Sequence, residues 1–345
     1  MTEPLQPSQP LPHLQPLLEL RDVSKRFGKP LDALAKVANL FGASMTAEVV
    51  HAVDQVTLTI HSGEVVGLVG ESGCGKSTLG RMAVGLHALS SGTRWWKGTD
   101  LATVSVAQRR QQQLAMQMIF QDPYASLNPR LRIQDIVGEA PLAHRMISAA
   151  QQKDYVAQLL QKVGLDPALA RRFPHQFSGG QRARIGIARA LAVNPQLLVC
   201  DEAVAALDVS IQAQVLNLFI KLRDELNLTY LFISHDLGVV RHVSDRVVIM
   251  YLGRIVESSP TAELFARPNH PYTVALLASA PKLEVKKIDF YAVKGEIPSP
   301  LHPPSGCHFH PRCPHAMPRC SVEQPLLKEI APGHFSACHL NDSIS

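Results

Sequence analysis

The sequence predicts an α/β fold, because short apolar strands alternate with helices along much of the chain. Residues 63–70, GEVVGLVG, form a β-branched run that ends in glycine, and KSTLGRMAVGLHAL (76–89) follows with helical spacing. The alternation returns with a buried strand at 195–202, an amphipathic helix at 209–226 and another strand at 229–236. Strand, glycine loop and helix in this order open an α/β unit.

Length and composition describe an ordinary globular chain. Its 345 residues are 46% hydrophobic and 18% charged, so it can bury a large core, divided over two or three domains. The net charge of +5 favours an ordinary solvated surface over a surface that faces anionic lipid. No run approaches the roughly 18 apolar residues of a membrane-spanning helix. Because no Lys/Arg-dense block contains interleaved aromatics, we expect no nucleic-acid partner.

The first residues, 1–16, predict a disordered lead-in. They are rich in Pro and Gln and lack the charged and apolar regions of a secretory signal. We therefore expect a cytoplasmic protein, whose thiols are kept reduced. The six cysteines then do not suggest a disulfide framework: Cys74 and Cys200 stand alone, and the other four cluster near the C-terminus.

The remaining elements follow the same patterns. Residues 17–27 and 50–60 alternate in the manner of strands, with a looser insertion between them. Gln-, Ala- and Leu-rich sequence at 131–175 predicts a mostly helical insert, and 245–258 predicts a hairpin. After about residue 282 the sequence becomes rich in Pro, His and Cys and loses its periodicity.

A phosphate-binding loop is predicted between the first strand and helix of the α/β unit. Residues 70–78, GESGCGKST, fit G-x-x-x-x-G-K-[ST] in the context that this motif requires. Glycines let backbone N–H groups point at an anion, and the start of the next helix adds to the attraction. A chance glycine-rich turn is the alternative. Lys76 is expected to reach the β- and γ-phosphates, and Ser77 to bind Mg²⁺. The predicted ATP-binding residues here are Gly70, Glu71, Ser72, Gly73, Cys74, Gly75, Lys76, Ser77 and Thr78.

An acidic pair ends the buried strand LLVCDE. Asp201 lies at the carboxyl end of this strand, where ligands bind in open α/β sheets, and its carboxylate can hold Mg²⁺ directly or through water. Glu202 can orient or deprotonate an attacking water, so we predict a catalytic role for it. The alternative is an acidic pair that merely ends a strand.

Further stretches narrow the class of protein. HQFSGGQRARIGIARALA (175–192) begins a long helix with SGGQ, a second helix start suited to an anion. Gln121 in FQDP can bind Mg²⁺ or hold water, and His235 in ISHD can hydrogen-bond a γ-phosphate. Each stretch alone indicates little, since a histidine at a strand end is more often structural; their order along the chain is what points to one family. The SGGQ residues are Ser178, Gly179, Gly180 and Gln181.

Taken in order, these motifs resemble those of the ATP-binding subunits of ABC transporters over roughly residues 17–340. The resemblance implies a P-loop NTPase fold of ABC type, with a RecA-like core, an antiparallel β subdomain, a helical subdomain at about 131–177 and a Cys-rich C-terminal extension. It divides the chain into a nucleotide-binding domain at 17–260 and an extension at 261–345. Phe27 is similar to the aromatic that stacks on adenine, with a core phenylalanine as the alternative.

The family resemblance also implies a mechanism. Glu202 and His235 are its catalytic residues, ATP and Mg²⁺ its ligands, and two subunits act head to tail, so that the SGGQ helix of one caps the ATP of the other. A lone domain therefore needs a second ABC ATPase subunit, and a sister subunit is favoured over a second copy of this chain. The resemblance further implies two membrane permease subunits, an extracytoplasmic solute-binding protein and a peripheral position on the cytoplasmic face of the membrane.

The chain departs from the family pattern at a few positions. Phe177 stands where leucine is common, and we expect it to pack rather than touch phosphate. Ala203 replaces a proline, and Ala205 removes a hydroxyl that would face the partner site. These changes leave Glu202 in place, so we expect hydrolysis to survive.

Several stretches are similar to the oligopeptide/dipeptide importer branch of the family. They are FQDPYASLNPRLRI (120–133), LDVSIQAQVLNL (207–218), the insertion at 28–48 and the tail from 270. The resemblance implies a subunit that energises import of di- or oligopeptides. The alternatives are an importer for nickel chelates or glutathione, a soluble ABC-type ATPase that acts on nucleic acid or ribosomes, and an exporter half.

The tail carries a cysteine cluster with the spacing C-x5-C-x6-C-x17-C. Four thiolates suit a [4Fe–4S] cluster or a tetrahedral zinc ion, and this loose spacing favours the iron–sulfur cluster; free thiols are the third reading. We expect a structural metal, because the tail is poor in periodic apolar residues for a core. Interleaved histidines are alternative ligands, although histidines beside proline are more often exposed. The cysteines are Cys307, Cys313, Cys320 and Cys338, and the histidines are His308, His310, His315 and His339.

Overall fold

A computed structural model of the chain describes residues 15–28, 48–122, 125–279 and 295–342. Almost all of the lead-in predicted at 1–16, and most of the insertion predicted at 28–48, lie outside the described residues. Among the described residues, no helix is long and apolar enough to cross a bilayer.

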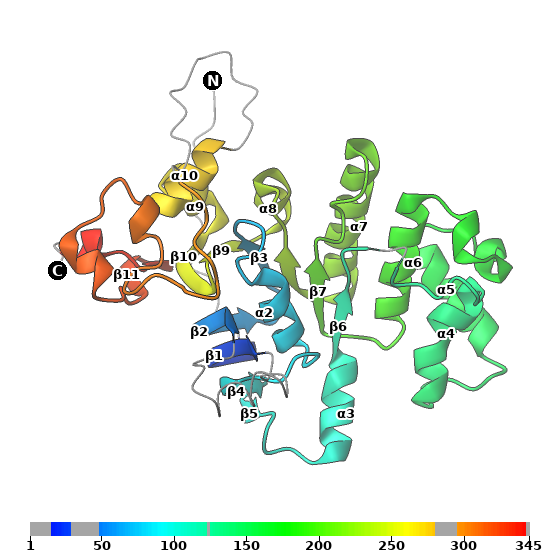
Figure 1. The fold of residues 1–345 in the computed structure, drawn as a ribbon. Helices are drawn as coiled ribbons and strands as arrows, with labels where there is room; N and C mark the ends of the chain where they lie inside the picture. The colour runs from blue at the N-terminus through cyan, green and yellow to red at the C-terminus, as the bar shows by residue number, and fades with distance from the viewer. Residues whose placement is uncertain (1–14, 29–47, 123–124, 280–294, 343–345) are drawn as a thin grey trace, which may run out of the picture.

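The strands form two sheets (Figure 1). The smaller sheet has the order β2-β1-β4-β5, and the larger one the order β11-β12-β10-β9-β3-β8-β7-β6. The strands of the smaller sheet are β1 (Pro16–Gly28), β2 (Val49–His61), β4 (Ser91–Trp96) and β5 (Thr99–Asp100). Those of the larger sheet are β3 (Val65–Val69), β6 (Met116–Ile119), β7 (Leu197–Asp201), β8 (Thr229–Ile233), β9 (Arg246–Tyr251), β10 (Arg254–Pro260), β11 (Lys328–Ala331) and β12 (His334–Ser336).

The pairing of the strands confirms the predicted α/β class. Strands β9, β3, β8, β7 and β6 run parallel to one another, and their residues are almost entirely buried, as expected for a sheet covered by helices on both faces. The strands predicted at 17–27 and 50–60 pair antiparallel as β1 and β2. The hairpin predicted at 245–258 is also confirmed, as β9 and β10.

Helices lie around the larger sheet and form a separate group beside β6 (Figure 1). This group contains α4, α5 and α6, whose apolar side chains share one core cluster with α7. The helical character predicted for 131–175 is thus confirmed. The helices are α2 (Lys76–Ala83), α3 (Val106–Ala115), α4 (Ile133–Ala143), α5 (Gln152–Lys162), α6 (Gly179–Leu191), α7 (Val209–Leu226), α8 (Leu237–Val243), α9 (Thr261–Ala266) and α10 (Pro271–Ser279).

The helix predicted at 76–89 is shorter than expected. Helix α2 ends at Ala83, and Gly85 follows with φ of +82°. A left-handed glycine just past the last turn is a common helix end, because glycine meets no Cβ penalty there. The helix was predicted to continue to residue 89 because the apolar spacing continues past Gly85.

The expectation that the tail cannot pack a core is wrong for its described part. Phe309 is 1% exposed, and its ring lies 5.2 Å from that of Tyr251 and 5.4 Å from that of Tyr272. Strand β12 extends the larger sheet by pairing with β10 at Glu257 and Ser258. Strands of three and four residues are too short to show a period of two, so the sequence pattern could not reveal them.

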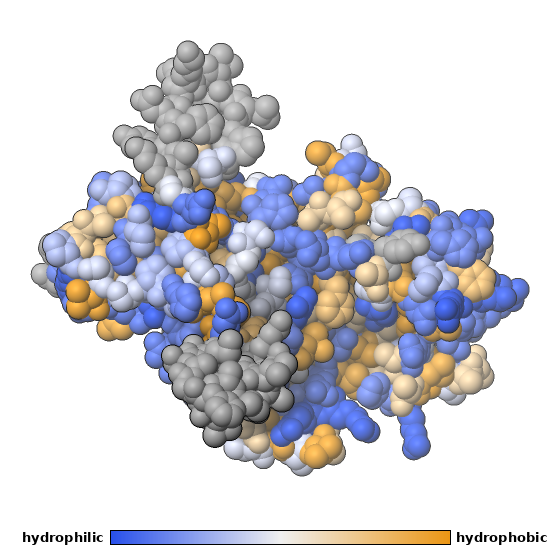
Figure 2. Space-filling model, viewed as in Figure 1, coloured by the Kyte–Doolittle hydropathy of each residue, from blue (hydrophilic) through white to orange (hydrophobic). Residues whose placement is uncertain are grey.

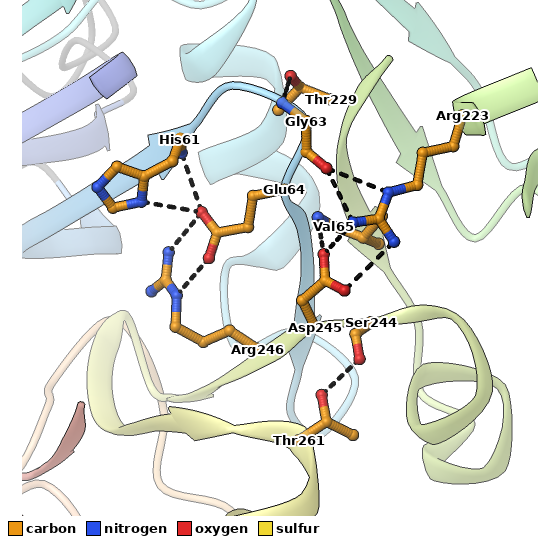
Figure 3. Close-up of polar contacts among 10 residues, drawn as sticks. All are labelled: His61, Gly63, Glu64, Val65, Arg223, Thr229, Ser244, Asp245, Arg246 and Thr261. Atoms are coloured by element: carbon orange, nitrogen blue, oxygen red, sulfur yellow. Dashed lines mark hydrogen bonds and ion pairs between the residues drawn. The ribbon is translucent and has the colours of Figure 1, made fainter. Parts of the chain in front are cut away.

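One ion pair joins the starts of β3 and β9, and a second joins α7 to the start of β9, at the end of the sheet away from the phosphate loop (Figure 3). Arg246 Nε donates to Glu64 Oε1 at 2.7 Å, and Arg223 Nη2 lies 2.6 Å from Asp245 Oδ2. Burial of Glu64 opposes its ionisation, but the hydrogen bond and charge of Arg246 outweigh burial and hold the pKa of this carboxyl below its usual range. These contacts lock the strand that leads into the phosphate loop.

Candidate nucleotide site and cysteine-rich extension

The predicted phosphate loop connects β3 to α2, so its last residues, from Lys76 onward, open the helix. Two of its glycines are required by close backbone contacts. A Cβ on Gly70 would lie 2.1 Å from the carbonyl oxygen of Met250, and one on Gly75 would lie 2.1 Å from that of Ala52. Gly75 also has φ of +106°. The loop is therefore packed tightly against β9 and β2.

Lys76 lies across the inside of this loop. Its side chain is buried, and Nζ donates to the carbonyl oxygens of Gly70 at 2.8 Å and Glu71 at 2.9 Å. These bonds hold the ammonium group where a phosphate enclosed by the loop would meet it. Contact of Lys76 with the β- and γ-phosphates stays a prediction.

Ser77 and Asp201 meet at the end of β7. Ser77 Oγ donates to Asp201 Oδ1 at 2.7 Å. Burial raises the pKa of the Asp201 carboxyl, while the Ser77 bond and the charge of Arg81 oppose that rise. A hydroxyl and a carboxylate side by side are the oxygen ligands that Mg²⁺ prefers, so this pair fits the ion.

Glu202 is held between the other two predicted strand-end residues. Gln121 Nε2 donates to Glu202 Oε2 at 2.7 Å, and His235 Nδ1 lies 3.3 Å from Glu202 Oε1. The backbone of Glu202 has φ of +48°, the left-handed region that non-glycine residues seldom adopt. Residues that follow three parallel strands, β6, β7 and β8, therefore meet at one carboxylate.

The SGGQ motif forms the start of α6, away from the phosphate loop. Ser178 caps the helix: its Oγ accepts from the backbone N–H of Gln181, and the Gln181 side chain accepts from the N–H of Ser178. Ser178 and Gly179 are exposed, whereas Gly180 is buried. Strands β6 and β7 separate α6 from α2 in Figure 1, so this helix start does not lie at the chain's own phosphate loop.

Phe27 lies at the end of β1 and is 39% exposed, which removes the alternative of a core phenylalanine. Its ring meets that of His87 edge-on with the centroids 5.5 Å apart. Phe27 is paired with Val50 of β2, two residues from Ala52, whose carbonyl contacts the loop at Gly75.

The departures from the family pattern occupy different environments. Phe177 is 5% exposed, which confirms that it packs. Ala203 is buried, and Ala205 is exposed in the turn that follows β7.

The four tail cysteines line one cavity, although Cys307 and Cys338 are 31 positions apart in the chain. Burial raises the pKa of Cys338 to about 11, and the neighbouring thiols add to the rise. Within the described ranges, no group of three or more His, Cys, Asp or Glu side chains is placed to hold a single metal ion. Which group, if any, the four thiols hold stays a prediction.

Two of the histidines differ from the expectation of exposure. His308 is buried with Nδ1 2.9 Å from the carbonyl oxygen of Leu252, and burial lowers its pKa to about 4. His339 is also buried, with Nε2 3.0 Å from the carbonyl oxygen of Glu323. His315 is exposed and His310 half-buried. The buried rings are held by local contacts that proline-rich sequence does not reveal.

The sequence did not predict the contacts between the extension and the phosphate loop. Arg312 Nη1 lies 2.8 Å from Glu71 Oε2, across a separation of 241 residues. Tyr272 Oη accepts from the Glu71 backbone N–H at 2.9 Å. No local pattern marks either pair, because each is created by the folding of distant segments onto one another.

Comparison with known proteins identifies the family. A family model for the ABC transporter matches residues 53–205, and one for the oligopeptide/dipeptide transporter C-terminal region matches 256–320. The chain is 50% identical over 328 residues to the oligopeptide transport ATP-binding protein AppF of Bacillus subtilis (strain 168), which covers 94% of this chain and 97% of that protein. The chain belongs to the ABC transporter ATP-binding subunits.

Solved structures agree with the fold of this ABC ATPase. A dimeric ATP-binding cassette in a post-hydrolysis state, bound to ADP and Pi, is 25% identical with a TM-score of 0.59, over 71% of this chain and 99% of that one. CbiO1 of Clostridium perfringens, part of an ABC transporter complex, has the same TM-score at 24% identity, over 73% and 92% of the two chains. The predicted P-loop NTPase fold of ABC type is confirmed, and with it the ATPase class of the enzyme.

Proposed function

We propose that this ABC ATPase energises the import of di- or oligopeptides by closing and reopening a pair of nucleotide-binding subunits. The observation that carries the proposal is the combination of an assembled hydrolytic constellation around Glu202 with a C-terminal region of the oligopeptide/dipeptide type. The relative named above, an oligopeptide transport ATP-binding protein, supports the same substrate class.

The side chains divide the work of hydrolysis. Loop amides and Lys76 hold the triphosphate. Ser77, Asp201 and Gln121 would hold Mg²⁺, which would withdraw negative charge from the phosphates. Glu202 accepts the proton of the attacking water. Gln121 contacts one oxygen of this carboxylate and His235 contacts the other, which keeps the carboxylate oriented. The His235 side chain is 58% exposed, so it is free to turn toward the γ-phosphate.

The site requires a partner. The exposed helix start at Ser178 is suited to cap a γ-phosphate, but it lies beyond β6 and β7 from the chain's own loop (Figure 1). A second ABC ATPase, a sister subunit rather than a second copy, would supply that cap. Two permease subunits and an extracytoplasmic solute-binding protein complete the importer, with this subunit peripheral on the cytoplasmic face of the membrane.

In the extension, we propose that Cys307, Cys313, Cys320 and Cys338 hold a [4Fe–4S] cluster, with zinc as the alternative. Support comes from the cavity that all four cysteines line, since four thiolates are the ligand set of either group. Anaerobic purification should give brown protein with stoichiometric iron and sulfide. Stoichiometric zinc without iron would contradict the cluster.

Reconstitution tests the transport function. The subunit, its sister ATPase and the two permeases are placed in proteoliposomes with the solute-binding protein, and phosphate release is measured with candidate solutes. Stimulation by di- or oligopeptides, lost in Glu202→Gln, is the expected result. Stimulation by a nickel chelate or by glutathione alone would assign a related importer, and stimulation of the free subunit by nucleic acid or ribosomes would overturn the proposal.

A further inference from the structure

Arg312 of the extension is fixed to the phosphate loop by a two-pronged ion pair. Its Nη1 and Nη2 atoms lie 2.8 Å and 3.1 Å from the two carboxylate oxygens of Glu71. The Arg312 side chain is 6% exposed and that of Glu71 23% exposed. A forked, largely buried pair of this kind has a defined geometry, unlike a pair on the open surface.

The extension also holds the backbone of Glu71. The Glu71 N–H donates to Tyr272 Oη, and the Tyr272 ring lies 4.7 Å from that of Tyr251. Tyr251 Oη in turn lies 3.3 Å from Arg312 Nη1. Together with Phe309, these aromatic rings form a buried cluster, which we call the aromatic platform (Tyr251, Tyr272, Phe309).

The negative charge of Glu71 connects this arrangement to nucleotide binding. Glu71 is the second residue of the phosphate loop, and its own carbonyl accepts from Lys76 Nζ. A free carboxylate at this position would repel a triphosphate and compete for the lysine. Arg312 turns the carboxylate toward the extension and neutralises it, so the loop presents its amides and Lys76 to the anion.

We propose that Arg312 is a positioning residue of the nucleotide site, through which the C-terminal extension neutralises Glu71 and sets the affinity of the phosphate loop for MgATP. The proposal rests on the assignment of residues 70–78 as the ATP-binding loop. It makes the extension part of the nucleotide site, so that ATP affinity and the order of the extension are linked.

A double-mutant cycle on the full chain tests the proposal. MgATP affinity is measured by titration calorimetry for the wild type, Arg312→Gln, Glu71→Gln and the double variant. Arg312→Gln should weaken binding about tenfold, because it leaves an unpaired carboxylate in the loop, whereas Glu71→Gln removes that carboxylate and should weaken binding less than Arg312→Gln does. The MgATP affinity of the double variant should recover to within about threefold of that of Glu71→Gln, because the repelling charge is gone.

The recovery separates an electrostatic role from a merely structural one. If the double variant binds as weakly as Arg312→Gln, or if Arg312→Gln binds as the wild type does, the proposal is overturned. The loss in Arg312→Gln should also be larger for ATP than for ADP and should shrink with added salt. Equal losses for both nucleotides, unaffected by salt, would likewise overturn it.

Controls keep the test independent of folding. Arg267→Gln removes another extension arginine that pairs with a carboxylate, Glu263, but does not reach the loop, and it should leave MgATP affinity unchanged. If Arg312→Gln does not fold, Arg312→Lys with and without Glu71→Gln gives the same comparison with a smaller loss. Lys76→Ala tests the site assignment separately: ATP binding that survives this change would remove the loop from its role, whatever Arg312 does.

Discussion

At the nucleotide site, the side chains that act together follow the carboxyl ends of neighbouring parallel strands, whereas in the extension the contacts that matter join segments far apart in the chain. Glu202, Gln121 and His235 meet because β6, β7 and β8 lie side by side. Arg312 meets Glu71 because the extension folds over the loop. A sequence motif can predict the first kind of site, whereas the second kind is created by tertiary packing.

The two regions also differ in what orders them. The nucleotide edge is carried by buried parallel strands. Ion pairs tie the start of β9 to Glu64 before β3 and, through Asp245, to α7 (Figure 3). The extension has short strands, the aromatic platform and the cysteine cavity. Its visible surface mixes hydrophilic residues with scattered hydrophobic ones, as does the rest of the face in Figure 2. We therefore expect hydrolysis to depend on single side chains. We expect the extension to be held in its folded conformation by a few buried aromatic rings.

The largest expected effect is on chemistry at the nucleotide edge. Glu202→Gln removes the proton acceptor but keeps the size of the side chain, so ATP hydrolysis should fall by about 10²- to 10⁴-fold while ATP still binds. Steady-state phosphate release and equilibrium ATP binding measure the two properties. Glu225→Gln, at an exposed position of α7, should leave both unchanged. Normal turnover in Glu202→Gln would remove this residue from the catalytic role.

Next in size is the loss of the buried ring in the extension. Phe309→Ala should lower the free energy of unfolding by about 3 kcal/mol, since it empties the centre of the aromatic platform. Denaturant unfolding of the purified chain measures this loss, and limited proteolysis should place the new cleavage in the extension. Val322→Ala, at a side chain that is 81% exposed, should stay within about 0.5 kcal/mol. Equal stability of the two variants would show that the platform does not order the extension.

A smaller effect is expected at the adenine end of the site. Phe27→Ala should weaken ATP binding about tenfold, because stacking of a base on an aromatic contributes about 1–3 kcal/mol. Binding of inorganic tripolyphosphate, which has no base, serves as the control and should not change. Phe27→Tyr should retain ATP affinity. An equal loss for ATP and tripolyphosphate would mean that Phe27 supports the loop rather than the base.

The smallest effect is the acid dependence of the ion pair at the other end of the sheet. The pKa of Glu64 is lowered in the folded chain, so its stabilising contribution is present above the glutamate value of about 4.3 in the unfolded chain. It is lost as the pH falls below that value through the folded pKa, with a slope of at most about 1.4 kcal/mol per pH unit.

Unfolding measured between neutral pH and pH 3 tests this dependence. Glu64→Gln should be less stable at neutral pH and should lose less stability on acidification than the wild type. Glu139→Gln, at an exposed position of α4, should keep the wild-type slope. Parallel acid curves for Glu64→Gln and the wild type would rule out this residue as a source of the acid sensitivity.

Much of the nucleotide edge was predictable from the sequence. The β-branched run at 63–70 and the apolar run at 195–202 identify buried strands, and parallel strands place their carboxyl ends on one edge. Glycines at 70 and 75 mark close approaches of the backbone, which the structure assigns to Met250 and Ala52. The boundary of α2 was misjudged, because apolar spacing continued past the glycine that ends the helix.

By itself, the sequence determined the α/β class, the phosphate loop, the residues that follow the strand ends and the family. These features depend on local patterns and on chain geometry that repeats in every parallel sheet. Only the tertiary structure decided that the tail shares a core with β9 and α10, that His308 and His339 are buried, and that Arg312 neutralises Glu71. Such contacts join residues 16 to 241 positions apart, and their pairing depends on shape and burial, which no local spacing records.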